Sequence, residues 1–230
     1  MKKRLITQII VLSIILIIPL VSAEILLGQP NEFYNLGDNF DIELTLTSSE
    51  ISSNFLIVEI VCGTKSSEIS RNPFALNPGD EEEIIINGVL TKSLIGEIKG
   101  ECFVEAKYGD EETRSQKFEI SSNLEVEFNS NNLGYNPGDS VILEGTASKQ
   151  NKATVNGFVD ISSKLNNALI TGKIDSGKFK VNFTLPENSA PGKFEITARA
   201  YEKDSNNEVS NEGTTTTTIE ISQIIEALDI

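Results

Sequence analysis

Apolar and polar residues alternate with a period of two along much of the chain. Phe40, Ile42, Leu44 and Leu46 alternate with acidic and threonine residues, and residues 179–185 repeat the pattern. This period is that of a β-strand with one buried face. Further strands are predicted at 24–27, 55–62, 83–90, 98–108 and 115–120, and then at 124–128, 140–146, 154–161, 168–174, 193–201 and 214–221. We therefore predict an all-β protein. The exception is residues 224–230, for which a short helix and disorder are the two alternatives.

An internal repeat divides the chain. The segment Tyr-Asn-Leu-Gly-Asp at 34–38 recurs as Tyr-Asn-Pro-Gly-Asp at 135–139, and Phe-Glu-Ile-Ser at 118–121 matches Ile-Glu-Ile-Ser at 219–222 in the same register. A shared register at both ends indicates a tandem duplication. We predict domains at 24–121 and 122–222, followed by a tail at 223–230. The connection around Ser122 is too short for a flexible coil, so we expect the two modules to touch and the particle to be elongated.

The amino terminus indicates export. Lys2, Lys3 and Arg4 precede an apolar stretch at 5–20, and small residues at 21–23 form a site for cleavage before Glu24. We predict a signal helix over residues 1–23 and a secreted or cell-surface location. The alternative is an uncleaved anchor, although the stretch is shorter than the roughly 20 residues that span a bilayer. If the segment is not cleaved, the protein would contact the membrane through this segment alone.

Composition removes several classes of function. The chain has no His, and this excludes histidine-dependent nucleophiles, bases and zinc sites. Its 34 acidic against 19 basic residues, with a net charge of -15, argue against nucleic acid as a partner. We predict neither enzymatic activity nor a cofactor.

The recurring turn carries a resemblance to a known class of domain. In the second copy Pro137 and Gly138 suit the centre of a turn, and Asp139 suits the start of a strand. With Ala-Pro-Gly-Lys-Phe at 190–194, this resembles the immunoglobulin-like sandwich modules of bacterial and archaeal surface proteins, of the fibronectin III or macroglobulin type. Leu36 replaces the proline in the first copy. The resemblance implies two tandem antiparallel immunoglobulin-like β-sandwiches, a fold that does not specify an activity.

Two acidic turns and one sequon are candidate sites. Asp80 and Glu81, and likewise Asp110 and Glu111, follow turns and could supply oxygen ligands to calcium. Neither has the spacing of a calcium loop, and a solvated sheet edge is the alternative. A carboxylate-dependent hydrolase is a remote further alternative. Asn182 lies in the single Asn-x-Ser/Thr sequon and could accept a glycan.

The two cysteines are predicted to pair. In the predicted strand 55–62, every second residue ending at Cys62 is apolar. In the predicted strand 98–108, the alternate residues that include Cys102 carry no charge, so both thiols should face one core. An exported chain favours oxidation. If their strands are neighbours in one sheet, the bridge is cross-strand, and two buried free thiols are the alternative.

These observations together predict an exported, noncatalytic structural, spacer or adhesion module. It would act through contacts with a cell-envelope or extracellular protein whose identity the sequence leaves open. A ligand-binding module for polysaccharide or calcium is the alternative.

Overall fold

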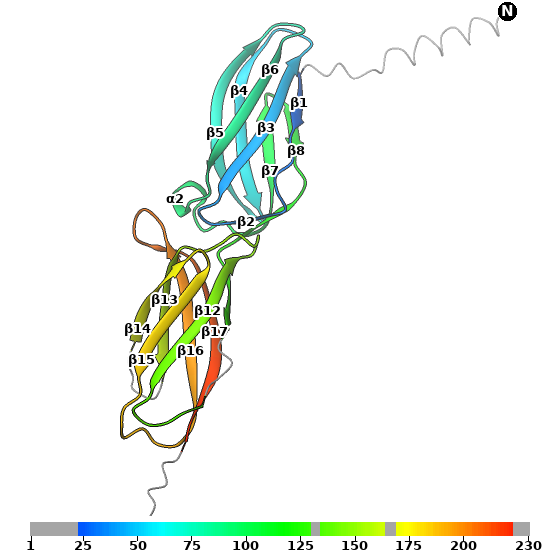
Figure 1. The fold of residues 1–230 in the computed structure, drawn as a ribbon. Coiled ribbons are helices and arrows are strands. Elements are labelled where there is room, and N and C mark those ends of the chain that lie inside the picture. Colours follow the sequence, from blue (N-terminus) through cyan, green and yellow to red (C-terminus); the bar gives the residue numbers. More distant parts are fainter. Residues whose placement is uncertain (1–22, 130–133, 164–168, 223–230) are drawn as a thin grey trace, which may run out of the picture.

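The computed structural model describes residues 23–129, 134–163 and 169–222, which form three β-sheets and one single-turn helix (Figure 1). The predicted signal segment, apart from Ala23, and the predicted tail lie outside these residues. Ala23, which cleavage before Glu24 would remove, is the first residue of β1. The described chain is therefore all-β in character. None of its helices is long and apolar enough to cross a membrane.

The N-terminal half, residues 23–121, packs two sheets face to face. Its elements are β1 (Ala23–Leu27), β2 (Phe33–Asn35), β3 (Asn39–Ser48), β4 (Ser52–Cys62), β5 (Lys65–Leu76), β6 (Glu81–Val89), α2 (Lys92–Ile95), β7 (Gly100–Tyr108), β8 (Glu111–Arg114) and β9 (Phe118–Ser121). One sheet has the order β1-β3-β6. The other has the order β2-β9-β7-β4-β5, with β8 paired to β7.

The C-terminal half, residues 122–222, has a similar strand arrangement. Its elements are β10 (Leu124–Phe128), β11 (Gly134–Tyr135), β12 (Ser140–Lys149), β13 (Gly157–Ser163), β14 (Leu169–Asp175), β15 (Lys178–Thr184), β16 (Gly192–Lys203) and β17 (Val209–Ile221). In this half β17 stands where the N-terminal half has β8 and β9, and its described residues have no counterpart of α2. Here β14 and β15 pair as a hairpin, which joins the strands into one path with the order β10-β12-β15-β14-β13-β16-β17-β11. The corresponding strands β5 and β6 of the N-terminal half belong to different sheets.

Each half has its own hydrophobic core, and the alternating residues build it. In β3 the side chains of Phe40, Ile42, Leu44 and Leu46 are all buried, while their acidic neighbours face solvent. Of the described residues, the buried apolar side chains form two clusters, one drawn from residues 23–120 and the other from 124–221. Burial of this apolar area is the main source of stability for each half.

Five described elements were not predicted from the sequence: the strands β2, β5, β8 and β11, and the helix α2. The helix α2 is a single turn, which begins where the Thr91 hydroxyl accepts a hydrogen bond from the Leu94 amide at 3.3 Å. The long strand β5 contains Pro73 and lies at the edge of its sheet, the position where a strand tolerates a residue without an amide hydrogen.

The disulfide joins Cys62 to Cys102 across neighbouring strands. The two residues are directly opposite in the register of β4 and β7, with their Cα atoms 4.1 Å apart. Both side chains are buried in the N-terminal core. The bridge therefore lies within one sheet and does not link the two sheets.

A cluster of charges covers the outer face of β7. The buried carboxylate of Glu105 forms ion pairs with Lys107 and with Arg114, whose guanidinium lies 5.0 Å from the ring centre of Phe103. Burial acts to raise the pKa of Glu105, but the hydrogen bonds from the two cations outweigh it and the pKa lies below its ordinary value.

Substituting Glu105 with Gln should make the N-terminal half less stable at neutral pH only. We expect a loss of about 1 kcal/mol in the free energy of unfolding at pH 7, because two ion pairs disappear. A depressed carboxyl pKa stabilises the fold above about pH 4.3, the ordinary value, and this contribution is lost as the pH falls through the folded-state pKa. Urea unfolding at pH 7 and pH 3 measures the difference.

The matched control is Glu101→Gln. Glu101 pairs with Lys117, but both side chains are about two-thirds exposed, so we expect little change at either pH. A difference between wild type and Glu105→Gln that does not shrink between pH 7 and pH 3 contradicts the electrostatic account.

Candidate functional site at the junction of the two halves

The recurring turn of the N-terminal half lies at the junction. Strand β2 pairs in parallel with β9, which places residues 34–38 beside the end of that half. Gly37 takes a positive φ of 86°, and the Asp38 carboxylate accepts a hydrogen bond from the Asn35 amide at 2.7 Å. This closes the turn and leaves the side chain of Asn35 directed toward the C-terminal half.

Asn35 connects the two halves through both ends of its side-chain amide. Its oxygen accepts a hydrogen bond from the Gln150 amide at 3.0 Å, and its nitrogen donates to the Asn123 carbonyl at 3.0 Å. The same nitrogen lies 3.5 Å from the side-chain oxygen of Asn211. Asn35 is fully buried, so these hydrogen bonds replace water that it would otherwise contact.

A buried lysine provides the charged contact. Lys149 donates to the Asp38 carboxylate at 2.7 Å and lies 3.6 Å from the Glu202 carboxylate. Asn151 donates to the second oxygen of Asp38 at 2.8 Å. The three charged side chains are each less than 15% exposed, so water screens their attraction less than at a fully exposed pair.

Asn211 completes the network from β17. Its side-chain nitrogen donates to the Leu36 carbonyl at 2.7 Å and to Glu202 at 2.8 Å. The connection between the halves is held as well, because Glu212 donates its amide hydrogen to the Ser122 carbonyl at 2.9 Å and pairs with Asn123. Backbone, amide and ionic contacts thus join the two halves, which lie end to end (Figure 1).

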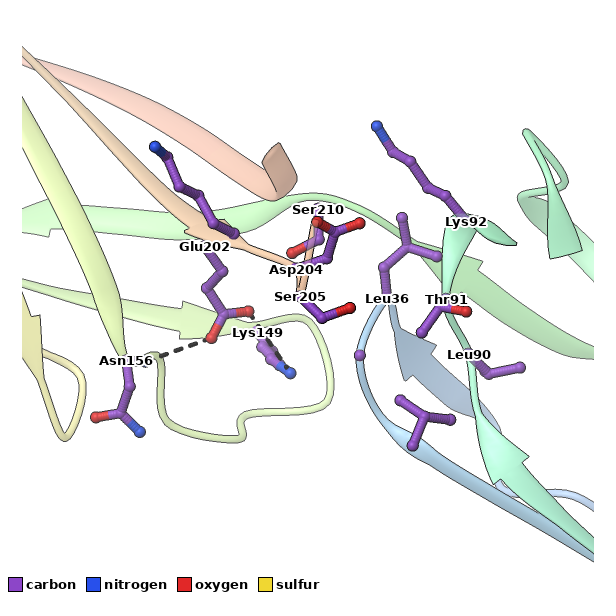
Figure 2. A pocket seen from close by; sticks show the side chains of 13 residues that line it. Leu36, Leu90, Thr91, Lys92, Lys149, Asn156, Glu202, Asp204, Ser205 and Ser210 are labelled. Carbon is purple, nitrogen blue, oxygen red and sulfur yellow. Dashed lines mark hydrogen bonds and ion pairs between the residues drawn. The ribbon is translucent and has the colours of Figure 1, made fainter. Parts of the chain in front are cut away.

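A cavity of about 440 Å³ opens beside this network (Figure 2). Leu36, Leu90, Thr91 and Lys92 line it from the N-terminal half. The C-terminal half contributes carboxylate, ammonium, amide and hydroxyl groups from Lys149, Asn156, Glu202, Lys203, Asp204, Ser205 and Ser210. As far as the described residues go, the lining includes no aromatic side chain on which a sugar ring could stack.

The structure places the residues predicted for calcium in the N-terminal half, at two turns and at the first residues of the strands that follow them. The Asp80 carboxylate accepts from the amide and the side chain of Asn77, at 2.7 and 3.0 Å, and so closes its own turn. Glu81 opens β6, and Asp110 precedes Glu111 at the start of β8. Among the described residues, no three acidic or cysteine side chains come together as metal ligands. The observed role of Asp80 is therefore structural.

The predicted glycan acceptor is accessible. Asn182 is exposed on β15, opposite Ile142 of β12. Its placement agrees with the parity of the neighbouring apolar residues, and glycosylation stays a prediction.

The residues of the junction were not identified as a site from the sequence, although parity contained a signal. In β12, Val141, Leu143 and Ala147 face the core, and Lys149 continues the same parity. Asn211 likewise shares the parity of Ile219 and Ile221 in β17. A lysine and an asparagine at inward positions indicate a buried polar contact.

Comparisons with known proteins add no family. No family model matches the chain, and no curated protein sequence matches it. Among solved structures, it is similar to a β-glucosidase from Listeria innocua, with a TM-score of 0.35 and 14% identity over 43% of this chain and 16% of that one. It is also similar to a DNA-bound alkylpurine DNA glycosylase, AlkC, from Pseudomonas fluorescens, with a TM-score of 0.38 and 15% identity over 44% and 30% of the two chains.

The chain thus spans less than a third of either protein's length. Similarity at this level carries no argument about function.

Proposed function

We propose that the chain is an exported, noncatalytic spacer or adhesion module, built from two tandem immunoglobulin-like β-sandwiches and acting through contacts with other envelope or extracellular proteins. The buried network around Asn35 carries the proposal. A protein that holds a binding surface at a fixed distance needs domains that do not rotate freely. Inter-domain contacts within a chain are mobile by default unless specific interactions fix them.

The chemistry of the junction supports a fixed geometry. A hydrogen-bonded side-chain amide requires particular directions, whereas an apolar contact tolerates sliding. Asn35 and Asn211 are both buried, and no polar side-chain atom in the buried part of the described chain lacks a hydrogen-bond partner. Rotation of one half against the other would leave several of these groups without partners, at a cost of about 1–3 kcal/mol each.

The alternative of a calcium or polysaccharide module receives less support. The acidic turns do not converge, and the junction cavity offers hydroxyl and charged groups without a stacking platform in the described part of the chain. The cavity is better explained as space left between the two halves beside the network.

The test is whether the two halves tumble as one body. We expect ¹⁵N relaxation and residual dipolar couplings of the wild type to fit a single elongated rotor. Asn35→Ala should give each half its own alignment, since the variant leaves the Gln150 amide and the Asn123 carbonyl without their partner. The equilibrium between docked and undocked halves should shift toward the undocked state by at least tenfold.

The matched control is Asn136→Ala, which removes the same residue from the second copy of the turn. That turn lies at the opposite end of the C-terminal half, so the variant should leave the junction unchanged. Independent tumbling of the two halves in the wild type contradicts the spacer proposal.

A further inference from the structure

The second copy of the turn has the same local structure as the first. The Asp139 carboxylate accepts a hydrogen bond from the Asn136 amide at 2.7 Å, as Asp38 does from Asn35. The reverse bond, from the aspartate amide to the asparagine carbonyl, is 3.1 Å in both copies. Strand β11 pairs in parallel with the end of β17, as β2 pairs with β9. The groups that dock the two halves therefore recur at the far end of the C-terminal half.

The two copies differ in what contacts them. In the first, the asparagine side chain is buried, and Lys149 and Asn151 reach the aspartate carboxylate. In the second, Asn136 is exposed. The Asp139 carboxylate accepts a hydrogen bond from the backbone amide of Asn136. The docking surface formed by residues 136–139 thus presents an amide and a carboxylate to whatever approaches this end.

We propose that residues 136–139 dock a further β-sandwich module of another molecule, which presents a lysine at the end of a strand and amide side chains in the loop that follows, as β12 does with Lys149. The inference rests on the proposed function. The lysine would pair with Asp139 as Lys149 pairs with Asp38. An amide hydrogen from the loop would reach the side chain of Asn136, as the Gln150 amide reaches Asn35.

The surroundings of the second turn favour a positively charged partner. A side chain added at Gly138 would lie 3.6 Å from Glu187, which follows β15. In the N-terminal half, the Leu90 amide donates to the Asp38 carbonyl, and Lys92 lies two residues after Leu90. In the C-terminal half, the Leu185 amide donates to the Asp139 carbonyl, and Glu187 lies two residues after Leu185. The second surface therefore has a carboxylate where the first has an ammonium group. The Glu187 carboxylate close to Gly138 adds attraction for a lysine. Lys193, opposite Glu220, stands where the N-terminal half has Glu101 opposite Glu119.

Neither the tail nor the N-terminal end of a second copy has the matching chemistry. Residues 223–230 contain Glu226 and Asp229 and no basic side chain. From the last residue of β12 onward the C-terminal half has Lys149, Gln150 and Asn151. From the last residue of β3 onward the N-terminal half has Ser48, Ser49 and Glu50. A second copy docking by that end would bring Glu50 toward Asp139, which is a repulsive pair. The occupant is therefore a different module.

The first experiment provides a module of the required chemistry in the same chain. Residues 122–222 are repeated directly after Ser222, so that a second Lys149 loop follows the second turn across the same short connection. Carbodiimide coupling then joins carboxylates to ammonium groups that already touch, and mass spectrometry identifies the linked peptides. We expect a link from Asp139 to the added Lys149, with a yield within twofold of the link from Asp38 to the original Lys149.

The link at Asp38 is the internal standard and reports on the proposed function separately. Asp139→Asn should abolish the new link and leave the standard, and Lys149→Met in the added copy should lower the new link at least tenfold. If the Asp38–Lys149 link forms and the link from Asp139 to the added Lys149 has less than a tenth of its yield, the docking inference is overturned and the spacer proposal survives.

A second measurement requires no added folded module. A cyclic peptide of residues 146–154, which carries the Lys149 loop, is titrated into the wild-type chain. We expect saturable shifts of the Asn136 and Asp139 amide signals and none at Asp38, whose partners are already in place. Absence of shifts at millimolar peptide, or equal shifts in Asp139→Asn, overturns the inference.

Discussion

Replacing Cys62 and Cys102 together by alanine should lower the free energy of unfolding of the N-terminal half by up to about 4 kcal/mol. The disulfide closes a loop with a sequence separation of 40, and the chain-entropy model gives this value for a loop of that length. The cross-strand register of β4 and β7 is built from many backbone hydrogen bonds, so the fold itself should persist. The loss is a large fraction of the stability of a domain of this size.

The C-terminal half supplies the control for this measurement, because both cysteines lie in the N-terminal half. Calorimetry should show one transition that moves to lower temperature in the double variant, and one that stays in place. Reduction of the wild type by a phosphine should reproduce the shift. Equal displacement of both transitions would mean that the halves unfold as one unit, and an unchanged N-terminal transition would mean that the bridge contributes nothing.

Much of the strand pattern could be predicted because burial imposes it. In β3, β12 and β15, every second residue packs into a core, so the sequence alternates. The same parity placed Cys62 and Cys102 on one face before their pairing was visible. Strand β5 has no such pattern, because as an edge strand it buries few side chains and is rich in serine and charged residues. Its position is determined by backbone pairing with β4, which the alternation of apolar and polar residues does not reveal.

The junction could be predicted only in part. The repeat and the short connection indicated that the two modules touch, but not which side chains meet. The aspartate of the recurring turn was predicted to act within its own turn, which Asp38 does, and no role was predicted for Asn35. The contacts of Asn35 and Asp38 across the junction depend on Lys149 and Asn211, more than 100 residues away, and on the rotation of one half against the other. No local sequence pattern encodes that rotation. The sequence indicated the contact only through Lys149 and Asn211, two polar residues at inward-facing positions of their strands.

The same dependence on tertiary contacts explains why a glycine in β17 is important to the junction. Gly213 lies opposite Ala200 of β16, and the backbone of Leu124 passes directly over it. A Cβ atom at Gly213 would lie 2.0 Å from the Leu124 carbonyl oxygen and 2.8 Å from its carbonyl carbon. The obstacle is backbone, not a flexible side chain, so the start of β10 must move to accommodate even a methyl group.

Gly213→Ala should therefore destabilise the C-terminal half by about 3 kcal/mol, the upper end of the usual cost of overpacking. It should also loosen the junction, because Asn211 and Glu212, which hold Leu36 and Ser122, precede Gly213 directly. Calorimetry of the C-terminal transition and ¹⁵N relaxation of the two halves measure the two effects. Gly134→Ala is the control, since the added methyl group would meet no atom within 4 Å among the described residues. If Gly213→Ala melts within a degree of the wild type, the close approach of Leu124 does not determine how the two halves join.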